Sequence, residues 1–226
     1  QLLATHRELS SAISHELRTP IARMRFALEM LSGTDERAER ERLWTMMEGD
    51  LDELDHLIDT SLTYARFERE APEPHFSSVR FADWLSDEVD AVRLLGRDLK
   101  ITVDTAKLPE NLAVDVDRKA MPYALRNLLR NAFKYASRQI VVSAELREPN
   151  ILVHVDDDGI GIPPEDRESV FSAFTRLDRS RDRATGGYGL GLAITRRVLE
   201  LHGGTATADG APLGGARFTL AWPLTQ

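Results

Sequence analysis

The first 65 residues carry two runs of apolar side chains at helical spacing, which restricts this part of the chain to paired helices. Apolar residues recur every three or four positions between Leu2 and Leu31, and again between Leu43 and Ala65. A spacing close to 3.6 residues predicts a helix with one apolar face. The residues between the two runs, 32–35 (SGTD), supply a helix breaker and capping side chains. The sequence therefore predicts an antiparallel helical hairpin.

A lone hairpin would leave one side of each apolar stripe exposed to water. A second hairpin of the same kind could cover those stripes and close a four-helix bundle. We therefore expect residues 1–70 to form an all-α dimerisation domain, and the chain to be a homodimer.

A differently patterned part follows the stretch 71–78 (APEPHFSS). Its two prolines cannot continue a helix and favour an extended linker. Residues 79–226 mix both periodicities, and adjacent strands with helices elsewhere predict an α+β two-layer sandwich. Helices are expected near 82–95, 118–136 and 190–202, and strands at 100–104, 112–116, 139–146, 151–156 and around residues 205 and 218.

The charge balance and the lack of cysteine exclude several classes of function. The chain has 37 Asp and Glu against 29 Lys and Arg, a net charge of -8, which disfavours nucleic acid and anionic membranes as partners. Without cysteine there is no disulfide, iron–sulfur or thiolate–zinc site, which is compatible with the cytoplasm. No run approaches the roughly 18 apolar residues of a membrane span. Because the chain starts without Met, we expect membrane contact only through segments absent from this chain.

The turn SHELRTP (14–20) is the most distinctive feature of the first predicted helix. His15 lies midway between two positions of the apolar stripe and is expected to be exposed. Pro20 lacks an N–H and predicts a kink one turn later, at a cost of about 3 kcal/mol. Thr19 follows His15 at i+4 and Glu16 is its neighbour, so an imidazole, a hydroxyl and a carboxylate share one turn.

Three interpretations of this turn remain open on the residues alone. His15 by itself is best explained as a surface histidine on a charged helix. A zinc protease helix reads HExxH, but Thr19 stands where the second ligand should be. The third interpretation is a nucleophilic imidazole that attacks a phosphoryl group, with Glu16 as its base.

Two glycine-rich segments of the second part could bind a nucleotide. GGYGLGL (186–192) opens a predicted helix, where backbone N–H groups attract anions, although it matches neither GxxxxGK nor GxGxxG. DDDGIGIP (156–163) ends a predicted strand. There Asp157 could accept a hydrogen bond from an exocyclic amine while the glycines let a ring approach the backbone. A solvated strand end or a magnesium site of three carboxylates is also open.

Polar residues that suit phosphates occur on either side of that strand. Asn127, Asn131 and Lys134 share one helix face and could bind magnesium and a phosphate chain, or form an ordinary polar face. The segment 170–185 holds four arginines in an otherwise acidic protein. A lid that closes over phosphates has this composition, and an ordinary surface loop is the alternative.

Six motifs follow the order of the H, N, G1, F, G2 and G3 boxes of sensor histidine kinases, and the chain resembles that family over nearly its whole length. They are HELRTP, NLLRNAFKYA, DDDGIGIP, FSAF, GGYGLGL and HGGTA. The segments FTRLDRSRDRATGGYGLGLAI and GGARFTLAWPL resemble the RstB-type branch of the family. The resemblance implies a dimeric four-helix phosphotransfer domain at 1–70, a linker at 71–78, and a catalytic Bergerat (GHKL) sandwich at 79–226.

Matched by position, the resemblance also implies roles for individual residues. His15 would accept the phosphoryl group, Glu16 would activate it, and Thr19 would serve in dephosphorylation of the partner. Asn131 would bind magnesium. The nucleotide would be contacted by Asn127, Lys134, Tyr135, Asp157, Gly159, Gly161, Arg176, Gly187, Gly189, Gly191 and Thr219. Asp158 and Ala136 depart from the family, which often has Asn and Thr or Ser there.

The implied function is ATP- and Mg²⁺-dependent autophosphorylation of a histidine, followed by transfer to an aspartate in the receiver domain of a response regulator. The resemblance further implies phosphatase activity on that regulator, and a place as the cytoplasmic core of an inner-membrane sensor. Two other functions stay open: a GHKL-type ATPase clamp that transfers phosphate only to water, and a non-catalytic dimerisation scaffold.

Overall fold

A computed structural model describes residues 2–69, 73–93, 99–177 and 188–225, with the side chains of 2–12, 15 and 69 left outside the description. The chain divides into two compact units. Residues 1–65 with 186–188 make up the first unit, and residues 66–185 with 189–226 make up the second.

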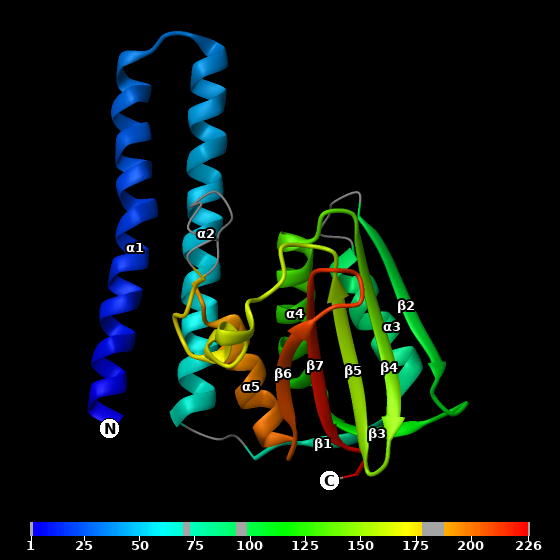
Figure 1. The fold of residues 1–226 in the computed structure, drawn as a ribbon. Coiled ribbons are helices and arrows are strands. Elements are labelled where there is room, and N and C mark those ends of the chain that lie inside the picture. The colour runs from blue at the N-terminus through cyan, green and yellow to red at the C-terminus, as the bar shows by residue number, and fades with distance from the viewer. Residues whose placement is uncertain (1, 70–72, 94–98, 178–187, 226) are drawn as a thin grey trace. The chain divides into compact units, whose positions relative to one another are not determined.

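The first unit is the predicted helical hairpin. Helix α1 (Leu2–Gly33) and helix α2 (Arg37–Arg69) run antiparallel and are joined by a short turn (Figure 1). Ala27 and Leu57 are fully buried, and α1 continues as an α-helix through Pro20. The hairpin expected from the two apolar stripes is therefore confirmed.

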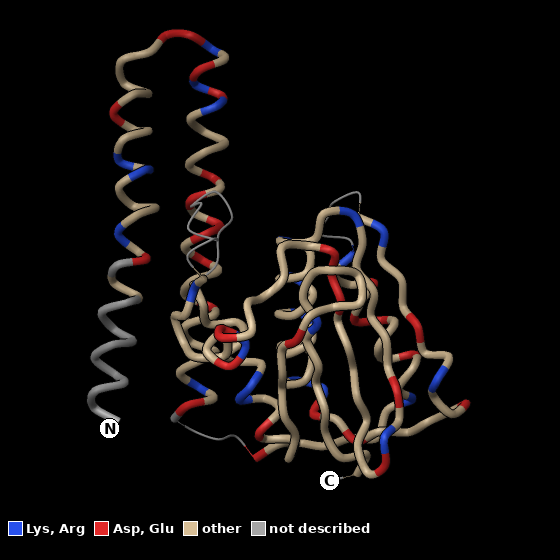
Figure 2. The backbone as a smooth tube through the Cα atoms, viewed as in Figure 1, with Lys and Arg blue, Asp and Glu red and all other residues tan. Residues whose placement is uncertain are grey.

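A charged contact joins the two helices of the hairpin. Residues 48–59 of α2 carry six acidic side chains and no Lys or Arg (Figure 2). Arg23 of α1 lies among them, donating from Nε to Asp50 Oδ1 at 2.8 Å and pairing with Glu53 through Nη2. Asp50 is buried, so this contact fixes the pairing of α1 with α2 from inside.

The outer side of α2 carries a stripe of exposed apolar side chains at seven-residue spacing. Trp44, Leu51 and Ile58 are 53%, 53% and 47% exposed. Ile21 and Leu28 repeat the same spacing on α1 and are also exposed. Seven-residue spacing of large apolar side chains is the pattern of helices that pack in bundles.

The second unit is an α+β sandwich, as expected from the sequence. Its five-stranded sheet has the order β2-β4-β5-β7-β6, with β2 parallel to β4 and the other pairs antiparallel. The strands are β2 (Lys100–Lys107), β4 (Gln139–Arg147), β5 (Asn150–Asp157), β6 (Thr205–Gly210) and β7 (Ala216–Pro223). The helices α3 (Phe81–Arg93), α4 (Met121–Tyr135) and α5 (Gly191–Leu201) lie on one face of this sheet (Figure 1).

The core of this unit lies between the sheet and the helices. Alternate residues of β4, β5 and β7, such as Ile140, Val153 and Trp222, point toward the helices and are buried. Leu128 of α4 and Val198 of α5 are buried on the helical side. Short 3₁₀ turns at Pro164–Asp166 (η1) and Ser169–Phe171 (η2) follow the sheet's central strand.

A strand that the sequence did not predict overlaps the expected linker. Strand β1 (Phe76–Arg80) pairs antiparallel with β3 (Ala113–Asp117) in a separate two-stranded sheet. Residues 76–78 therefore have ladder partners, although the prolines before them favour an extended connection. The domain boundary at 71–78 stays a prediction. No helix among the described residues is long and apolar enough to cross a membrane.

Candidate nucleotide-binding site

A buried carboxylate stands at the end of the central strand β5. Asp157 is 2% exposed, and its Oδ1 accepts hydrogen bonds from the N–H groups of Gly159 at 2.8 Å and Ala216 at 3.1 Å. Burial raises the pKa of Asp157, and the charges of Asp158 and Asp156 raise it further against these two hydrogen bonds. A carboxylate oriented in this way can accept a hydrogen bond from an amino group of a ligand.

Glycines allow the backbone to come close to this carboxylate. A Cβ at Gly159 would lie 2.3 Å from the carbonyl oxygen of Tyr135, and one at Gly215 would lie 2.3 Å from Asp157 Oδ1. Gly161 has a φ of +70°, a conformation that side-chain-bearing residues rarely adopt. The end of β5, the end of α4 and the start of β7 thus meet without side chains between them.

The neighbouring carboxylate, Asp158, joins the end of α4 to the same turn. It accepts hydrogen bonds from the backbone N–H groups of Ser137, Arg138 and Gln139, at 2.8 to 3.2 Å. These N–H groups, Arg138 foremost, lower the pKa of Asp158. The Asp158 carboxylate therefore has a defined structural partner.

The three consecutive aspartates point to three different partners. Asp156 binds Arg217, Asp157 binds the backbone of Ala216, and Asp158 binds the loop after α4. Among the described residues, no group of three His, Asp or Glu side chains could hold a metal ion. In this structure the three carboxylates therefore do not converge on one point.

Helices α4 and α5 bring the predicted phosphate-binding residues to the same region. Asn127 donates from Nδ2 to the carbonyl of Gly191 at 3.0 Å, and a Cβ at Gly191 would touch the Asn127 side chain at 3.3 Å. Asn131 follows one turn later on α4 and is partly buried. The ammonium group of Lys134 lies 4.8 Å from the ring centroid of Tyr135. The contact between Asn127 and Gly191 therefore joins the polar face of α4 to the start of α5.

A backbone hydrogen bond joins Phe174, inside the segment predicted as a lid, to Gly189, which follows that segment. The N–H of Phe174 donates to the carbonyl of Gly189 at 2.9 Å, and both residues have positive φ angles. Arg176 is partly buried beside this junction. Gly187 and the arginines at 179, 181 and 183 lie outside the described residues.

The residues predicted to take part in phosphotransfer lie on α1. Glu16 and Thr19 are partly buried, one and four positions after the predicted phosphoacceptor. Residue 15 is part of the helix, but its side chain lies outside the described residues, so the exposure of His15 stays a prediction.

Family profiles match both parts of the chain. Residues 5–70 match the His Kinase A (phospho-acceptor) domain, and residues 116–226 match the histidine kinase-, DNA gyrase B-, and HSP90-like ATPase. The chain is 40% identical over 226 residues to the Escherichia coli K12 sensor protein RstB, covering 99% of this chain and 50% of that protein. The chain belongs to the sensor histidine kinases.

Other sensor histidine kinases are similar over the same region. The E. coli K12 sensor histidine kinase CpxA is 32% identical, with 99% of this chain and 48% of CpxA covered. SenX3 of Mycobacterium tuberculosis H37Rv is 34% identical, with 97% and 54% covered. The chain thus spans about half the length of the curated relatives it matches. It contains the phosphoacceptor and ATPase domains of a protein-histidine kinase.

Solved histidine kinases share the fold. The Acinetobacter baumannii histidine kinase AdeS has a TM-score of 0.69 at 24% identity, with 93% of this chain and 98% of that chain covered. The mycobacterial sensor histidine kinase MprB has a TM-score of 0.56 at 27% identity, with 66% and 97% covered. The hairpin followed by an α+β sandwich is therefore the expected architecture of this kinase.

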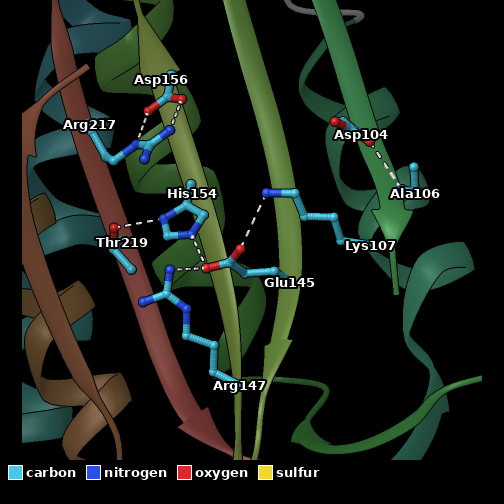
Figure 3. Close-up of polar contacts among 9 residues, drawn as sticks. All are labelled: Asp104, Ala106, Lys107, Glu145, Arg147, His154, Asp156, Arg217 and Thr219. Atoms are coloured by element: carbon cyan, nitrogen blue, oxygen red, sulfur yellow. Dashed lines mark hydrogen bonds and ion pairs between the residues drawn. The ribbon is translucent and has the colours of Figure 1, made fainter. Parts of the chain in front are cut away.

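Thr219 is separated from the other predicted nucleotide contacts. Its Oγ1 lies 2.8 Å from Nδ1 of His154, on the sheet face that also carries Asp156 and Arg217 (Figure 3). Along β7 the neighbouring Phe218 and Leu220 are buried toward the helices, so strand alternation turns Thr219 away from them. The predicted contact between Thr219 and adenine does not fit this geometry.

Sequence reasoning missed the part of β7 that reaches Asp157. Ala216 supplies one of its two N–H donors, and Gly215 makes the close approach possible. The glycine pair in GGARF was the available signal, because adjacent glycines before a strand often mark close backbone contact. Thr195 was also missed; its hydroxyl lies 3.0 Å from the Gly191 carbonyl and 3.3 Å from that of Ala124, where α5 crosses α4.

Proposed function

We propose that this kinase transfers the γ-phosphoryl group of ATP to His15, and then to an aspartate in the receiver domain of a response regulator. The main support is the joint presence of the HELRTP motif in the phosphoacceptor domain and the Asp157 pocket in the ATPase domain. An ATPase clamp or a dimerisation scaffold would need only one of these two features.

In the proposed first step, a ring nitrogen of neutral His15 attacks the γ-phosphorus while the bond to the β,γ-bridging oxygen breaks and ADP leaves. Glu16 accepts the proton from the other ring nitrogen, which keeps the attacking nitrogen electron-rich. The γ-phosphoryl group must be held in line with the imidazole for this to occur. In the reverse role, Thr19 would position a water for removal of phosphate from the regulator.

The nucleotide pocket supports distinct roles for its residues. We assign Asp157 to the adenine amino group and Tyr135 to the edge of the adenine ring. We assign Asn127, Lys134 and Arg176 to the phosphates, near the start of α5, where Asn127 packs against Gly191. We assign Gly159, Gly161 and Gly189 to shaping the backbone around the nucleotide, and Gly187, which lies outside the described residues, is assigned there by its motif alone. Among these, the orientation of Asp157 by Gly159 and Ala216 is the best supported by geometry.

We assign magnesium to Asn131. An amide oxygen is a suitable ligand for this hard cation, and Asn131 shares the α4 face with Asn127, so the donor set fits a site completed by phosphate oxygens. When bound, magnesium would neutralise charge that develops on the β- and γ-phosphates.

We further infer that the chain acts as a homodimer. The stripe of Trp44, Leu51 and Ile58, with Ile21 and Leu28 on α1, is a large apolar surface for a single hairpin. A second copy can cover it symmetrically and form a four-helix bundle. Light scattering should give twice the chain mass, and Leu51→Glu should shift the mass toward the monomer. A monomeric wild-type chain would contradict this proposal.

We also infer that the kinase is the cytoplasmic core of an inner-membrane sensor that has phosphatase activity on its regulator. The relatives named as sensor proteins are about twice as long as this chain. In the complete protein, membrane attachment would be tested by fractionation of cells with and without alkaline carbonate washing.

The central test is incubation of the purified chain with γ-labelled ATP and magnesium. Acid-labile, alkali-stable label is expected on the wild type and should be lost in His15→Ala. His75→Ala is the matched control, because this exposed histidine bonds to Asp117 only through its backbone N–H among the described contacts. Steady phosphate release without label would instead support an ATPase clamp, and neither label nor release would support a scaffold.

A further inference from the structure

On the sheet face away from the helices, β5 and β7 share an ion pair with fork geometry. Arg217 donates from Nε to Asp156 Oδ1 at 2.7 Å and from Nη2 to Oδ2 at 2.6 Å (Figure 3). Asp156 is only 4% exposed, so this pair is shielded from water on the carboxylate side. Two parallel hydrogen bonds fix the relative position of the two strands more tightly than a single contact does.

The pair stands at the last rung of the β5–β7 ladder. Asp156 and Arg217 are register partners, and the next residues beyond them are Asp157 and Ala216. Across this step the Ala216 N–H donates to Asp157 Oδ1. The ion pair on one face therefore holds the backbone that orients the carboxylate on the other face.

The chain enters β7 through a glycine turn from β6, and Ala216 and Arg217 also have ladder partners in Gly210 and Asp209 of β6. Gly214 has a φ of +97° and Gly215 follows it, in a tight turn where Ala211 and Gly215 share a backbone hydrogen bond. Gly215 packs against Asp157 so closely that a Cβ would overlap its Oδ1. A small displacement of this turn would therefore change the position of the Ala216 donor.

Arg217 also balances a charge next to the pocket. The negative charge of Asp156 raises the pKa of Asp157, and Arg217 is the cation that offsets it. Loss of Arg217 would leave a buried, unpaired carboxylate one residue from the group that faces the ligand.

We propose that Arg217 is a positioning residue for adenine recognition. Its ion pair with Asp156 on the outer face keeps the Ala216 N–H in place, and this donor orients Asp157 toward the adenine amino group. This role rests on the proposed contact between Asp157 and adenine. Arg217 itself touches no nucleotide in this scheme; it acts through the end of the β5–β7 ladder.

The same sheet face supplies a matched control. At the other end of β4, Arg147 pairs with Glu145 at 2.6 Å, and Lys107 approaches the same carboxylate at 3.5 Å. A cavity of about 360 Å³ is lined by both ion pairs. Arg147 lies at the hairpin end of the β4–β5 ladder, at the opposite end from Asp157. Its loss therefore removes an outward-facing ion pair without changing the strand pairing at Asp157.

The experiment measures dissociation constants of the whole chain for ATP and for purine riboside triphosphate, which lacks the 6-amino group. Both are measured with magnesium, for the wild type, Arg217→Lys, Arg217→Ala and Arg147→Ala. Wild type should prefer ATP. Arg217→Lys keeps the charge but loses the fork, so ATP binding should weaken roughly tenfold while binding of the analogue stays unchanged. Arg147→Ala should retain the wild-type preference.

Several outcomes would overturn the proposal. These are an unchanged ATP preference in Arg217→Lys, an equal loss for both nucleotides, or the same loss of preference in Arg147→Ala. Melting temperatures are recorded in parallel, and if Arg217→Ala does not fold, the folded Arg217→Lys variant decides. A wild type that binds both nucleotides equally would instead refute the adenine contact of Asp157, while label on His15 would still support the kinase reaction.

Discussion

The backbone N–H of Arg138 donates to both oxygens of the Asp158 carboxylate, at 3.0 and 3.1 Å. Ser137 and Gln139 add two more N–H donors to Oδ1, so one side chain holds three consecutive backbone groups. These groups follow Ala136, the residue after Tyr135 at the end of α4. Asp158 thereby links the end of that helix to the turn that carries Asp157.

Replacement of Asp158 should weaken nucleotide binding. Asp158→Ala removes every acceptor for the three N–H groups, so the end of α4 and the Asp157 turn lose their link, and the dissociation constant for ATP should rise several-fold. Asp158→Asn keeps one acceptor oxygen and should lie between this variant and the wild type. Calorimetric titration of ATP checks the order, with the surface variant Asp90→Ala as control. Wild-type affinity in Asp158→Ala would refute the link.

Acid should destabilise the catalytic unit partly through Asp158. The pKa of Asp158 is lowered in the folded state, so its contribution to the free energy of unfolding is complete above the ordinary Asp pKa of about 3.9. That contribution is lost as the pH falls through the lowered folded value. Urea unfolding between pH 5 and 2.5 should show a shallower loss in Asp158→Asn than in the wild type. A Trp44→Phe background leaves Trp84 and Trp222 as reporters of the catalytic unit. Parallel pH curves would contradict the prediction.

Gly159 should not tolerate a side chain. In Gly159→Ala the new Cβ would meet the carbonyl oxygen of Tyr135 at 2.3 Å, so the turn must shift and ATP binding should fall by at least about tenfold. Gly210→Ala is the matched control, because the nearest atom to its Cβ is the end of the Arg167 side chain at 3.5 Å. Fluorescence titration with a labelled ATP analogue compares the two variants. Equal affinities would show that the turn can adapt.

Loss of Arg23 should destabilise the hairpin. Arg23→Ala would leave Asp50 buried without its cation, at a cost of about 2 to 3 kcal/mol, since about a third of the Arg23 side chain is exposed. The double variant Arg23→Met, Asp50→Leu should recover most of that loss. Urea unfolding followed by circular dichroism measures both, with the exposed pair variant Arg37→Ala as control. No recovery in the double variant would mean that the ion pair itself is required.

The sequence predicts those parts of this kinase in which one local pattern decides the structure. The stripes of α1 and α2 are long enough to define a hairpin, and the DDDGIGIP motif locates Asp157 correctly at a strand end. Strand β1 was missed because its partner β3 lies more than 30 residues away along the chain. Which face of the sheet Thr219 points to depends on the alternation of side chains along β7. The apolar residues on either side of it, Phe218 and Leu220, could have indicated that Thr219 points away from the core.

The partners of Asp156 and Asp158 could not be read from the chain. Arg217 is 61 residues from Asp156, and the three N–H groups bound by Asp158 belong to the loop after α4 and the first residue of β4, which carry no sequence signature. Such contacts depend on the register between strands and on the exact end of a helix, and a local motif specifies neither.

The alternation of outward polar and inward apolar side chains along β5 also determines the register in which this sheet can form. His154 and Asp156 face outward and alternate with Val153 and Val155, which are buried on the other side. A slip of one residue against β7 would turn the carboxylate into the apolar layer and the valines toward Arg217. Burying an unpaired carboxylate costs far more than exposing a valine. Misaligned sheets are thus strongly disfavoured, and the outward charges select the correct strand alignment before any nucleotide is bound.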